Sequence, residues 1–357
     1  MKLNIEQKTL AATLKRLSSI VETRNTIPIL ANVALTAADG ALTLTVTDLD
    51  IQATATIAAT VEADGACTVG AKMLADIVSK LPSGGLVSLD WAQDKIKISA
   101  GRSKFELSTL PIEDFPQLAS DTFAASFDIA ADDLAALFGA VFAASSEEAR
   151  YYLQGVYLHQ IDGQTVAVAT DGHCLAHVSR GVSCPDCPGV IVPRKTVLEA
   201  AKSLAEGQVT VSVSDTKIRF QADHFTLLSK VIDGTFPDYT RVIPAANKGK
   251  ATFDADDMRT VIDRVVVVSS EKTRAVKLSI AQDWIEVSNR SPQSSASDGV
   301  TAGIDGADVE IGFNGAYFSE ALRQMSGLVT MQYSGPGDPV ILSASAGAKY
   351  IVMPMRV

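Results

Sequence analysis

A single order of predicted elements occurs three times along this chain, with a period of roughly 120 residues. Residues 127–244 carry a strand, an amphipathic helix, a second strand that begins at Tyr152, a helix over IVPRKTVLEAAKSLAEG and three alternating strands. The N-terminal third repeats this order from MKLNIEQKTL onward, and the C-terminal third repeats it from ATFDADDMRT onward. A repeat this long indicates a duplicated domain rather than a solenoid, whose repeats are shorter.

The patterns within each copy predict an α+β fold. Leu42, Leu44 and Val46 alternate with threonines, and this period of two is typical of antiparallel strands with one buried face. The two helices of each copy would then pack on antiparallel sheets. We therefore predict three similar domains, at residues 1–120, 123–245 and 249–357, joined by turn-rich segments.

Apolar residues at helical spacing predict the buried face of each helix. In chain order the stripes are Leu10, Leu14, Leu17 and Val21; Met73, Ile77 and Leu81; Leu134, Phe138, Val141 and Phe142; Val197, Leu198, Ala201 and Leu204; Met258, Val261, Ile262 and Val265; and Tyr317, Ala321 and Met325. Basic residues such as Lys15, Lys202 and Arg264 flank these stripes. They predict a positive helical surface, although ordinary solvated helix faces have the same pattern.

The net charge of −10 at pH 7 argues against a nucleic-acid partner if the charge is evenly spread. The acidic residues, however, lie mainly in the predicted strands, turns and loops. A local positive surface can hold phosphates on an acidic protein, because screening limits the reach of exposed charges to about 10 Å.

The chain contains no recognisable catalytic motif, since GxxxxGK[ST], GxGxxG, HExxH and GxSxG patterns do not occur. Cys184 and Cys187 form a lone CxxC, which with Cys174 and His177 has the ligand types of a zinc site and by itself those of a redox pair. Pro185 and Pro188 favour a surface loop instead. We expect no metal, no cofactor and no catalysis, and keep a zinc or thiol enzyme as the alternative.

The chain has no apolar run near the ~20 residues that span a bilayer. Its N-terminus, MKLNIEQKTL, lacks the apolar core of a signal peptide. We therefore expect a cytoplasmic protein.

Several segments match one known family. They are TRNTIPIL, GRSKFELSTLP, DFP at 114–116, RYYLQG at 150–155, ATDGH at 169–173, VPRK at 192–195, FPDYTRVIP at 236–244, EIGFN at 310–314 and the terminal YIVMPMRV. Over its full length the chain resembles the beta subunit of bacterial replicative DNA polymerase, the sliding clamp. The resemblance implies a processivity factor without catalysis, in which two chains join head to tail into a ring of six domains around duplex DNA.

The resemblance also implies which residues contact double-stranded DNA: Arg24, Arg150, Tyr151, Tyr152 and Lys195. Phosphate contacts from lysine and arginine are independent of sequence and sensitive to salt, which lets a protein slide. Aromatic rings beside a cation also suit bases, although Arg150-Tyr151-Tyr152 would equally fit the start of a strand. Glu147 stands where a polar uncharged residue is common in the family.

A peptide-binding groove between the second and third domains is implied as well. Its residues would be Leu153, Thr170, Gly172, His173, Leu175, Pro237, Arg241, Val242, Asn314, Tyr317, Pro339, Ile351, Met353, Pro354, Met355 and Arg356. Methionines re-pack around varied ligands, which suits many partners. The partners would be the replicative polymerase catalytic subunit, the clamp loader, translesion polymerases, and mismatch-repair and ligase-type proteins, each through a short linear motif. Cys174 and Val357 depart from some relatives and would shift ligand preference.

The homodimer joint would pair residues 102–107 of one chain with the helix end at 265–269 of the other. Its residues would be Arg102, Lys104, Phe105, Leu107, Val267 and Val268. The segment RSPQSSASDGV, where relatives carry acidic partners for Arg102 and Lys104, holds only Asp298. We therefore expect ion pairing to contribute little to the dimer. A peptide-binding scaffold that does not hold DNA is a further alternative.

Overall fold

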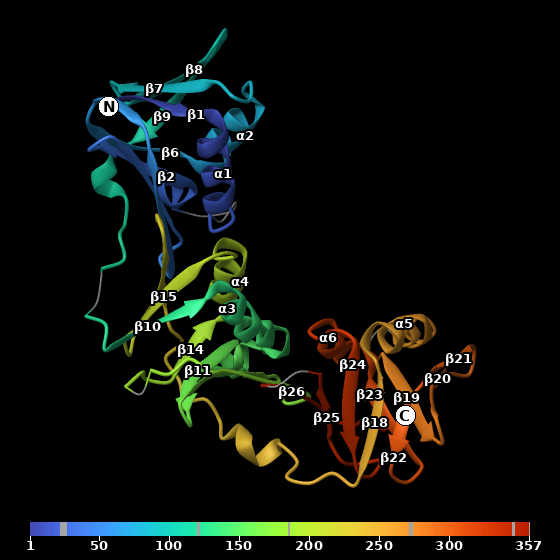
Figure 1. The fold of residues 1–357 in the computed structure, drawn as a ribbon. Coiled ribbons are helices and arrows are strands. Elements are labelled where there is room, and N and C mark those ends of the chain that lie inside the picture. Colours follow the sequence, from blue (N-terminus) through green and yellow to red (C-terminus); the bar gives the residue numbers. More distant parts are fainter. Residues whose placement is uncertain (22–26, 120–121, 185, 271–273, 345–346, 357) are drawn as a thin grey trace. The chain divides into compact units, whose positions relative to one another are not determined.

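The computed structural model describes residues 1–21, 27–119, 122–184, 186–270, 274–344 and 347–356 (Figure 1). The chain folds into two compact units. The first unit comprises Met1–Asp132, Asp186–Pro188 and Leu198–Val231, and the second comprises Asp133–Pro185, Gly189–Val197 and Ile232–Val357. Among the described residues, no helix has the length and apolar character needed to cross a membrane.

The first unit is built on one sheet, which has thirteen strands among the described residues, in the order β10-β15-β16-β17-β4-β3-β2-β6-β9-β8-β7-β1-β5. Its central strands are buried on alternate residues, as the alternation of Leu42, Leu44 and Val46 predicts. The strands are β1 (Lys2–Glu6), β2 (Asn32–Ala38), β3 (Ala41–Thr47), β4 (Ile51–Ala58), β5 (Thr60–Ala63), β6 (Gly65–Gly70), β7 (Leu86–Ala92), β8 (Lys95–Ala100), β9 (Ser103–Leu110), β10 (Ala125–Ala130), β15 (Gln208–Val213), β16 (Lys217–Ala222) and β17 (Phe225–Lys230).

Two helices of the first unit lie side by side, α1 (Gln7–Ser18) and α2 (Ala71–Lys80). Helix α1 buries Leu10, Leu14 and Leu17, as predicted. The stripe predicted for α2 is wrong, because Met73 is 58% exposed and the helix buries Ala71, Leu74 and Val78 instead. The unit also contains two short 3-10 segments, η1 (Pro28–Ala31) and η2 (Ile112–Asp114).

The second unit has two sheets among its described residues, one of nine strands and one of four. The nine-stranded sheet has the order β14-β11-β12-β13-β26-β25-β24-β18-β22, and the four-stranded sheet has the order β21-β20-β19-β23. The strands are β11 (Gly155–Ile161), β12 (Gln164–Thr170), β13 (Cys174–Arg180), β14 (Val190–Pro193), β18 (Gly249–Asp254), β19 (Ala275–Ala281), β20 (Trp284–Arg290), β21 (Ser295–Thr301), β22 (Gly303–Asp305), β23 (Val309–Asn314), β24 (Leu328–Tyr333), β25 (Val340–Ser343) and β26 (Ala348–Val352).

Helices α5 (Ala255–Val266) and α6 (Gly315–Arg323) pack on each other in the second unit. Both begin at a side-chain cap, since Asp254 accepts from the N–H groups of residues 256 and 257, and Asn314 accepts from that of residue 316. The predicted stripe of α5 is confirmed. In α6 the buried positions include Phe318 and Leu322, whereas Tyr317 is half-buried.

Three other predictions are corrected in the middle third. Helix α3 (Ala131–Phe138) ends at Phe138 and continues as the 3-10 segment η3 (Gly139–Ala143), so Val141 and Phe142 are only half-buried. The strand predicted to begin at Tyr152 begins at Gly155, because residues 148–153 form a 3-10 segment, η4 (Glu148–Leu153). Helix α4 (Arg194–Ser203) exposes Leu198 and Ala201, contrary to the predicted stripe. A further 3-10 segment, η5 (Tyr239–Val242), follows β17.

The predicted duplication extends to individual hydrogen bonds. Between β3 and β4, Thr47 Oγ1 donates to Ile51 O (2.9 Å), and the backbone N–H of Leu49 donates to Thr47 Oγ1 (3.1 Å). Asp48 Oδ1 accepts from the N–H groups of Asp50 (2.9 Å) and Ile51 (2.7 Å). Leu49 has a φ of +82°, a conformation that normally favours glycine.

The same four bonds recur between β12 and β13, in residues 170–174, with Gly172 at a φ of +92° in the position of Leu49. The strand after each turn also pairs alike, β4 with β17 and β13 with β26, both antiparallel. These pairings join one third of the chain to the next, so each compact unit contains parts of more than one predicted domain. Every strand pair among the described residues is antiparallel. Together with the helices, this confirms the predicted α+β fold class.

Candidate functional site

The turn between β12 and β13 is held by the side chains of Thr170 and Asp171. Thr170 Oγ1 donates to Cys174 O (2.7 Å) and accepts from Gly172 N (3.1 Å). Asp171 Oδ1 accepts from the backbone N–H groups of His173 (2.8 Å) and Cys174 (2.9 Å). The turn therefore presents Gly172 and His173, both exposed, in one fixed conformation.

The second carboxylate oxygen of Asp171 ties this turn to α6. Tyr317 Oη donates to Asp171 Oδ2 (2.5 Å), and the His173 and Tyr317 rings stack with centroids 6.1 Å apart. Burial, followed by the bond to Asp171, raises the pKa of Tyr317. The structure thus brings together the predicted groove residues Thr170, His173 and Tyr317, through an aspartate that sequence reasoning did not assign.

An apolar cluster lies beside this turn and contains Leu153, Leu175 and Ile351, three of the predicted groove residues. Tyr152, predicted to contact DNA, packs against the cluster and is half-buried. The other buried members are Val166, Val168, Ile191, Phe236, Tyr239 and Ile341. Sequence reasoning missed Phe236 and Tyr239, although both lie in the quoted segment FPDYTRVIP, and no pattern marked Ile341.

The C-terminal segment runs from this turn to β23. Met353 N donates to His173 O (2.9 Å), and Met355 N donates to Gly312 O (2.8 Å). Met353, Pro354 and Met355 are half-buried and Arg356 is exposed. A cavity of about 550 Å³ is lined by Pro354, Met355 and Arg356, together with Lys277, Glu310, Gly312, Pro336 and Gly337.

The other predicted groove residues have separate local roles. Pro237, Arg241 and Val242 are exposed around η5, where Arg241 pairs with Asp238 (2.8 Å). Asn314 caps α6, and Pro339 is half-buried just before β25. Val357 lies outside the described residues.

Five aromatic rings pack together where the segment that follows β17 lies on β11 and β13. Three come from the two strands and two from the segment. The His159 ring stacks on Tyr157 (4.5 Å between centroids), and Tyr157 stacks on Phe236 (5.0 Å). Tyr239 lies 5.7 Å from His159 and 5.8 Å from His177, and its Oη is 3.0 Å from His159 Nε2. Phe236 and Tyr239 therefore hold the segment that carries Pro237 and Arg241 onto the sheet.

The stability of the protein should decrease as the pH is lowered, because His159 and His177 are buried. Burial lowers the pKa of both, with a further lowering of His159 by His177 and of His177 by Lys349. Since the folded pKa lies below the unfolded value of about 6.5, their contribution is full above that pH and is lost as pH falls through the folded pKa. The urea midpoint, measured from about pH 7 to about pH 5, should fall less in a His159→Gln/His177→Gln variant than in the natural protein. The exposed His224→Gln variant should keep the natural slope, and equal slopes in all three proteins would contradict the assignment.

Three of the five predicted DNA contacts, Arg150, Tyr151 and Tyr152, lie in η4. Tyr151 is 52% exposed and meets Tyr152 edge-on, with ring centroids 5.7 Å apart. The Arg150 guanidinium forms an ion pair with Glu147 (2.7 Å). Lys195 is half-buried in the first turn of α4, and Arg24 lies outside the described residues.

The residues predicted for the dimer joint are accessible in each unit. In the first unit Phe105 is 40% exposed on β9, with Arg102 and Lys104 also exposed. In the second unit Val267 is 80% exposed just after α5, and Val268 is half-buried. Asp298 pairs with Arg264 of the same chain (2.8 Å).

Nothing in the described part of the chain has the arrangement of an enzyme metal centre, since no three His, Cys, Asp or Glu side chains are grouped to hold an ion. Burial raises the pKa of Cys67 to about 12 and that of Cys174 even further, so neither thiol is ionised at neutral pH.

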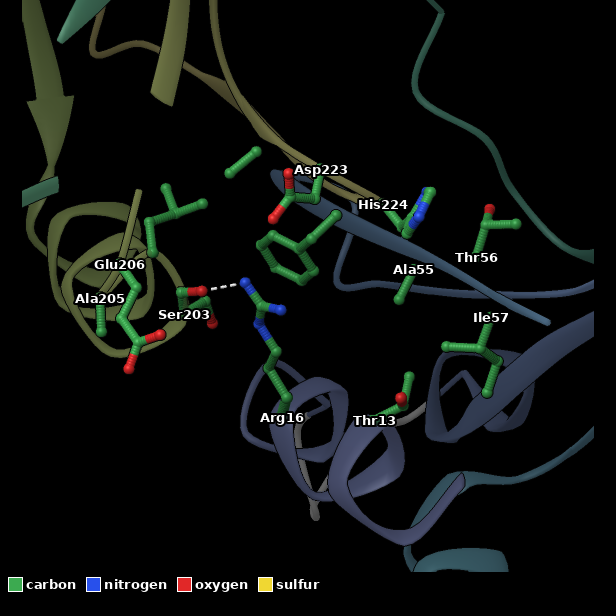
Figure 2. Close-up of a pocket in the computed structure, with 13 residues that line it drawn as sticks. Thr13, Arg16, Ala55, Thr56, Ile57, Ser203, Ala205, Glu206, Asp223 and His224 are labelled. Carbon is green, nitrogen blue, oxygen red and sulfur yellow. Dashed lines mark hydrogen bonds between the residues drawn. The ribbon is translucent and has the colours of Figure 1, made fainter. Parts of the chain in front are cut away.

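A further cavity, of about 390 Å³, lies in the first unit where α1 approaches β4 and β17 (Figure 2). The Arg16 guanidinium lies 3.6 Å from the Phe225 ring centroid and donates to Ser203 O. Burial lowers the pKa of Arg16. Glu206 and Asp223 also line the cavity, so it carries both signs of charge, and Arg16 serves to join α1 to the end of α4 and to β17.

Three family models match the chain in succession. They describe the N-terminal, central and C-terminal domains of the DNA polymerase III beta subunit, and match residues 1–119, 128–238 and 240–356. The chain is 40% identical to the beta sliding clamp of Caulobacter vibrioides and 34% identical to that of Escherichia coli, covering 100% of each chain.

Solved structures agree with these matches. The sliding clamp of Bartonella birtlesii, bound to griselimycin, has a TM-score of 0.95 and 37% identity, with 100% of both chains covered. The clamp of Caulobacter crescentus, with polyethylene glycol in a putative beta-motif tethering region, has a TM-score of 0.94 and 39% identity, covering 100% of this chain and 99% of the other.

Proposed function

Because this chain belongs to the bacterial DNA polymerase III beta-subunit family, the sliding clamps, we propose that it closes as a head-to-tail homodimer around duplex DNA and slides along it. The protein is a non-catalytic processivity factor of DNA polymerase III. The observation that carries this conclusion is the match of three successive family domains over the whole chain.

The proposed DNA contacts are Arg24, Arg150, Tyr151, Tyr152 and Lys195. Cations beside aromatic rings, of which Tyr151 is exposed, suit a sequence-independent grip on phosphates and bases. Since chromosomal DNA is the proposed ligand, we place the protein in the cytoplasm, at the nucleoid.

Topological binding has a direct test. The protein, loaded onto circular DNA by its clamp loader, should stay bound through gel filtration, and cutting the circle should release it. Equal retention on circular and linear DNA would contradict encirclement, whereas no retention on either would favour the peptide-scaffold alternative.

We propose that the Asp171 turn, the apolar cluster and the C-terminal methionines form the peptide site. The partners would be the polymerase catalytic subunit, the clamp loader, translesion polymerases, and mismatch-repair and ligase-type proteins. A buried apolar floor beside exposed polar turn residues suits short motifs that combine aliphatic side chains with backbone hydrogen bonds. Relatives that bind griselimycin, or polyethylene glycol in a tethering region, support a ligand site on this fold.

The proposed dimer should be insensitive to salt. Asp298, the only acidic residue between positions 290 and 300, is already paired with Arg264 of its own chain. The dimer dissociation constant should therefore change less than about threefold in an Arg102→Ala/Lys104→Ala variant. Sedimentation measures this constant across salt concentrations, and Phe105→Ala, which removes apolar contact area, should weaken the dimer and prove the assay sensitive. A steep rise of the constant with salt would contradict this prediction.

A further inference from the structure

Both carboxylate oxygens of Glu147 contact the guanidinium of Arg150. Arg150 Nη2 lies 2.7 Å from Glu147 Oε1, and Arg150 Nε donates to Glu147 Oε2 at 2.9 Å. The side chain of Arg150 is 31% exposed and that of Glu147 is 60% exposed, so both can be reached from solvent. A two-pronged contact of this kind occupies the same fork of donors that binds a phosphate group.

The backbone fixes this pair in place. Arg150 interrupts η4 with non-helical dihedral angles (φ −113°, ψ 52°), and its N–H donates to Glu147 O (3.1 Å). The N–H of Glu147 donates in turn to Ser145 Oγ (3.1 Å). The ion pair therefore forms within one short, well-bonded segment and needs little further ordering of either side chain.

The other edge of the Arg150 guanidinium faces Gly172 in the Asp171 turn. A Cβ atom placed on Gly172 would lie 3.2 Å from Arg150 Nη1, so only glycine leaves this edge its full room. The nearby Asp171 carboxylate is already bonded by two backbone N–H groups and by Tyr317. Glu147 is thus the carboxylate that directly pairs with Arg150 among the described residues.

We propose that Glu147 is an internal counter-ion that occupies Arg150 until a DNA phosphate displaces it, and so weakens the grip of the clamp on duplex. This inference rests on the proposed function, in which Arg150 contacts DNA. The carboxylate and a phosphate compete for the Nε and Nη2 donors, so a two-pronged phosphate contact through this edge of Arg150 requires breaking the Glu147 pair. A loose grip of this kind favours sliding over tight binding. The lowered pKa of Glu147, caused first by its bond to Arg150, keeps it ionised at neutral pH.

The test measures DNA binding of the full-length protein as a function of salt. The anisotropy of a short linear duplex, titrated at roughly 50–200 mM salt, yields the affinity and the slope of its logarithm against that of the salt concentration. Glu147→Gln should raise affinity by about two- to fivefold and steepen the slope by up to about one for each Arg150. Glu148→Gln removes the same charge from the next residue and should leave both quantities unchanged.

A double-variant cycle separates the inference from the proposed function. Arg150→Gln should weaken binding and flatten the slope, and Glu147→Gln should then have no effect in the Arg150→Gln background. If Arg150→Gln changes neither quantity, the DNA contact itself is wrong. If Arg150→Gln weakens binding but Glu147→Gln behaves like Glu148→Gln, the DNA contact stands and the counter-ion role is overturned. Thermal melting of each variant checks that the fold is retained.

Discussion

Replacing Asp171 by alanine should weaken peptide binding at least tenfold. Its carboxylate accepts two backbone N–H groups of the turn and the hydroxyl of Tyr317, so the substitution releases both sides of the proposed peptide site. Each hydrogen bond to a charged group contributes about 1.5–3 kcal/mol, and a tenfold change in affinity needs only about 1.4 kcal/mol. Calorimetry with a peptide from the clamp-binding segment of the replicative polymerase measures the loss.

The chain contains a matched control for this substitution. Asp48 makes the same two backbone bonds in the repeated turn of the first unit. Asp48→Ala should therefore lower stability through the same loss of turn bonds, and leave peptide affinity unchanged. Tyr317→Phe removes only the hydroxyl, and should weaken the peptide by less than Asp171→Ala does.

Two results would contradict this account. A peptide affinity of Asp171→Ala equal to that of the natural protein would mean that the turn at residues 170–174 is no part of the site. A loss in Asp48→Ala as large as that in Asp171→Ala would mean that the effect is a general loss of stability.

The repeat of element order predicted much of this fold, because the alternation of buried and exposed residues along a strand can be seen in the local sequence. Helix faces were less predictable. Met73 fits an apolar stripe at helical spacing, yet α2 turns Leu74 and Val78 to the core, so the contact with α1 and the sheet decides the face. At η4 the aromatic pair Tyr151-Tyr152 has strand propensity, but a 3-10 turn places Tyr152 on the apolar cluster.

The candidate site was predictable where it consists of quoted segments, and not where it depends on pairing between distant strands. The pairing of β13 with β26 brings residues 351–353 beside His173, across more than one predicted domain. Nothing in the local sequence around Asp171 indicates that Tyr317 is its partner, since the two residues are 146 positions apart in the chain. The missed residues Phe236, Tyr239 and Ile341 are buried by the same long-range packing.

Replacing Gly155 by alanine should destabilise the second unit by about 3 kcal/mol or more. A Cβ atom there would lie 2.3 Å from Val192 O and 3.0 Å from Val192 C. Because both are backbone atoms of the paired strand β14, no side chain can rotate away to make room. The strands must separate instead, which breaks the pairing of β11 with β14 and the bond from Arg194 N to Gln154 O (3.1 Å).

Gly181→Ala is the matched control, because the added methyl group would meet nothing within 4 Å. It should change stability by no more than about 0.5 kcal/mol. Hydrogen exchange is the better readout, since a protein with two units does not unfold in one step. The amides of β11 and β14 should lose protection in Gly155→Ala, while those of β3 and β4 in the first unit keep it. Because η4 ends directly before β11, the same variant should also loosen the segment that carries Arg150 and Leu153. If the amides of β11 and β14 exchange in Gly155→Ala as slowly as in the natural protein, these strands tolerate a wider spacing. The position of η4 then does not depend on their contact.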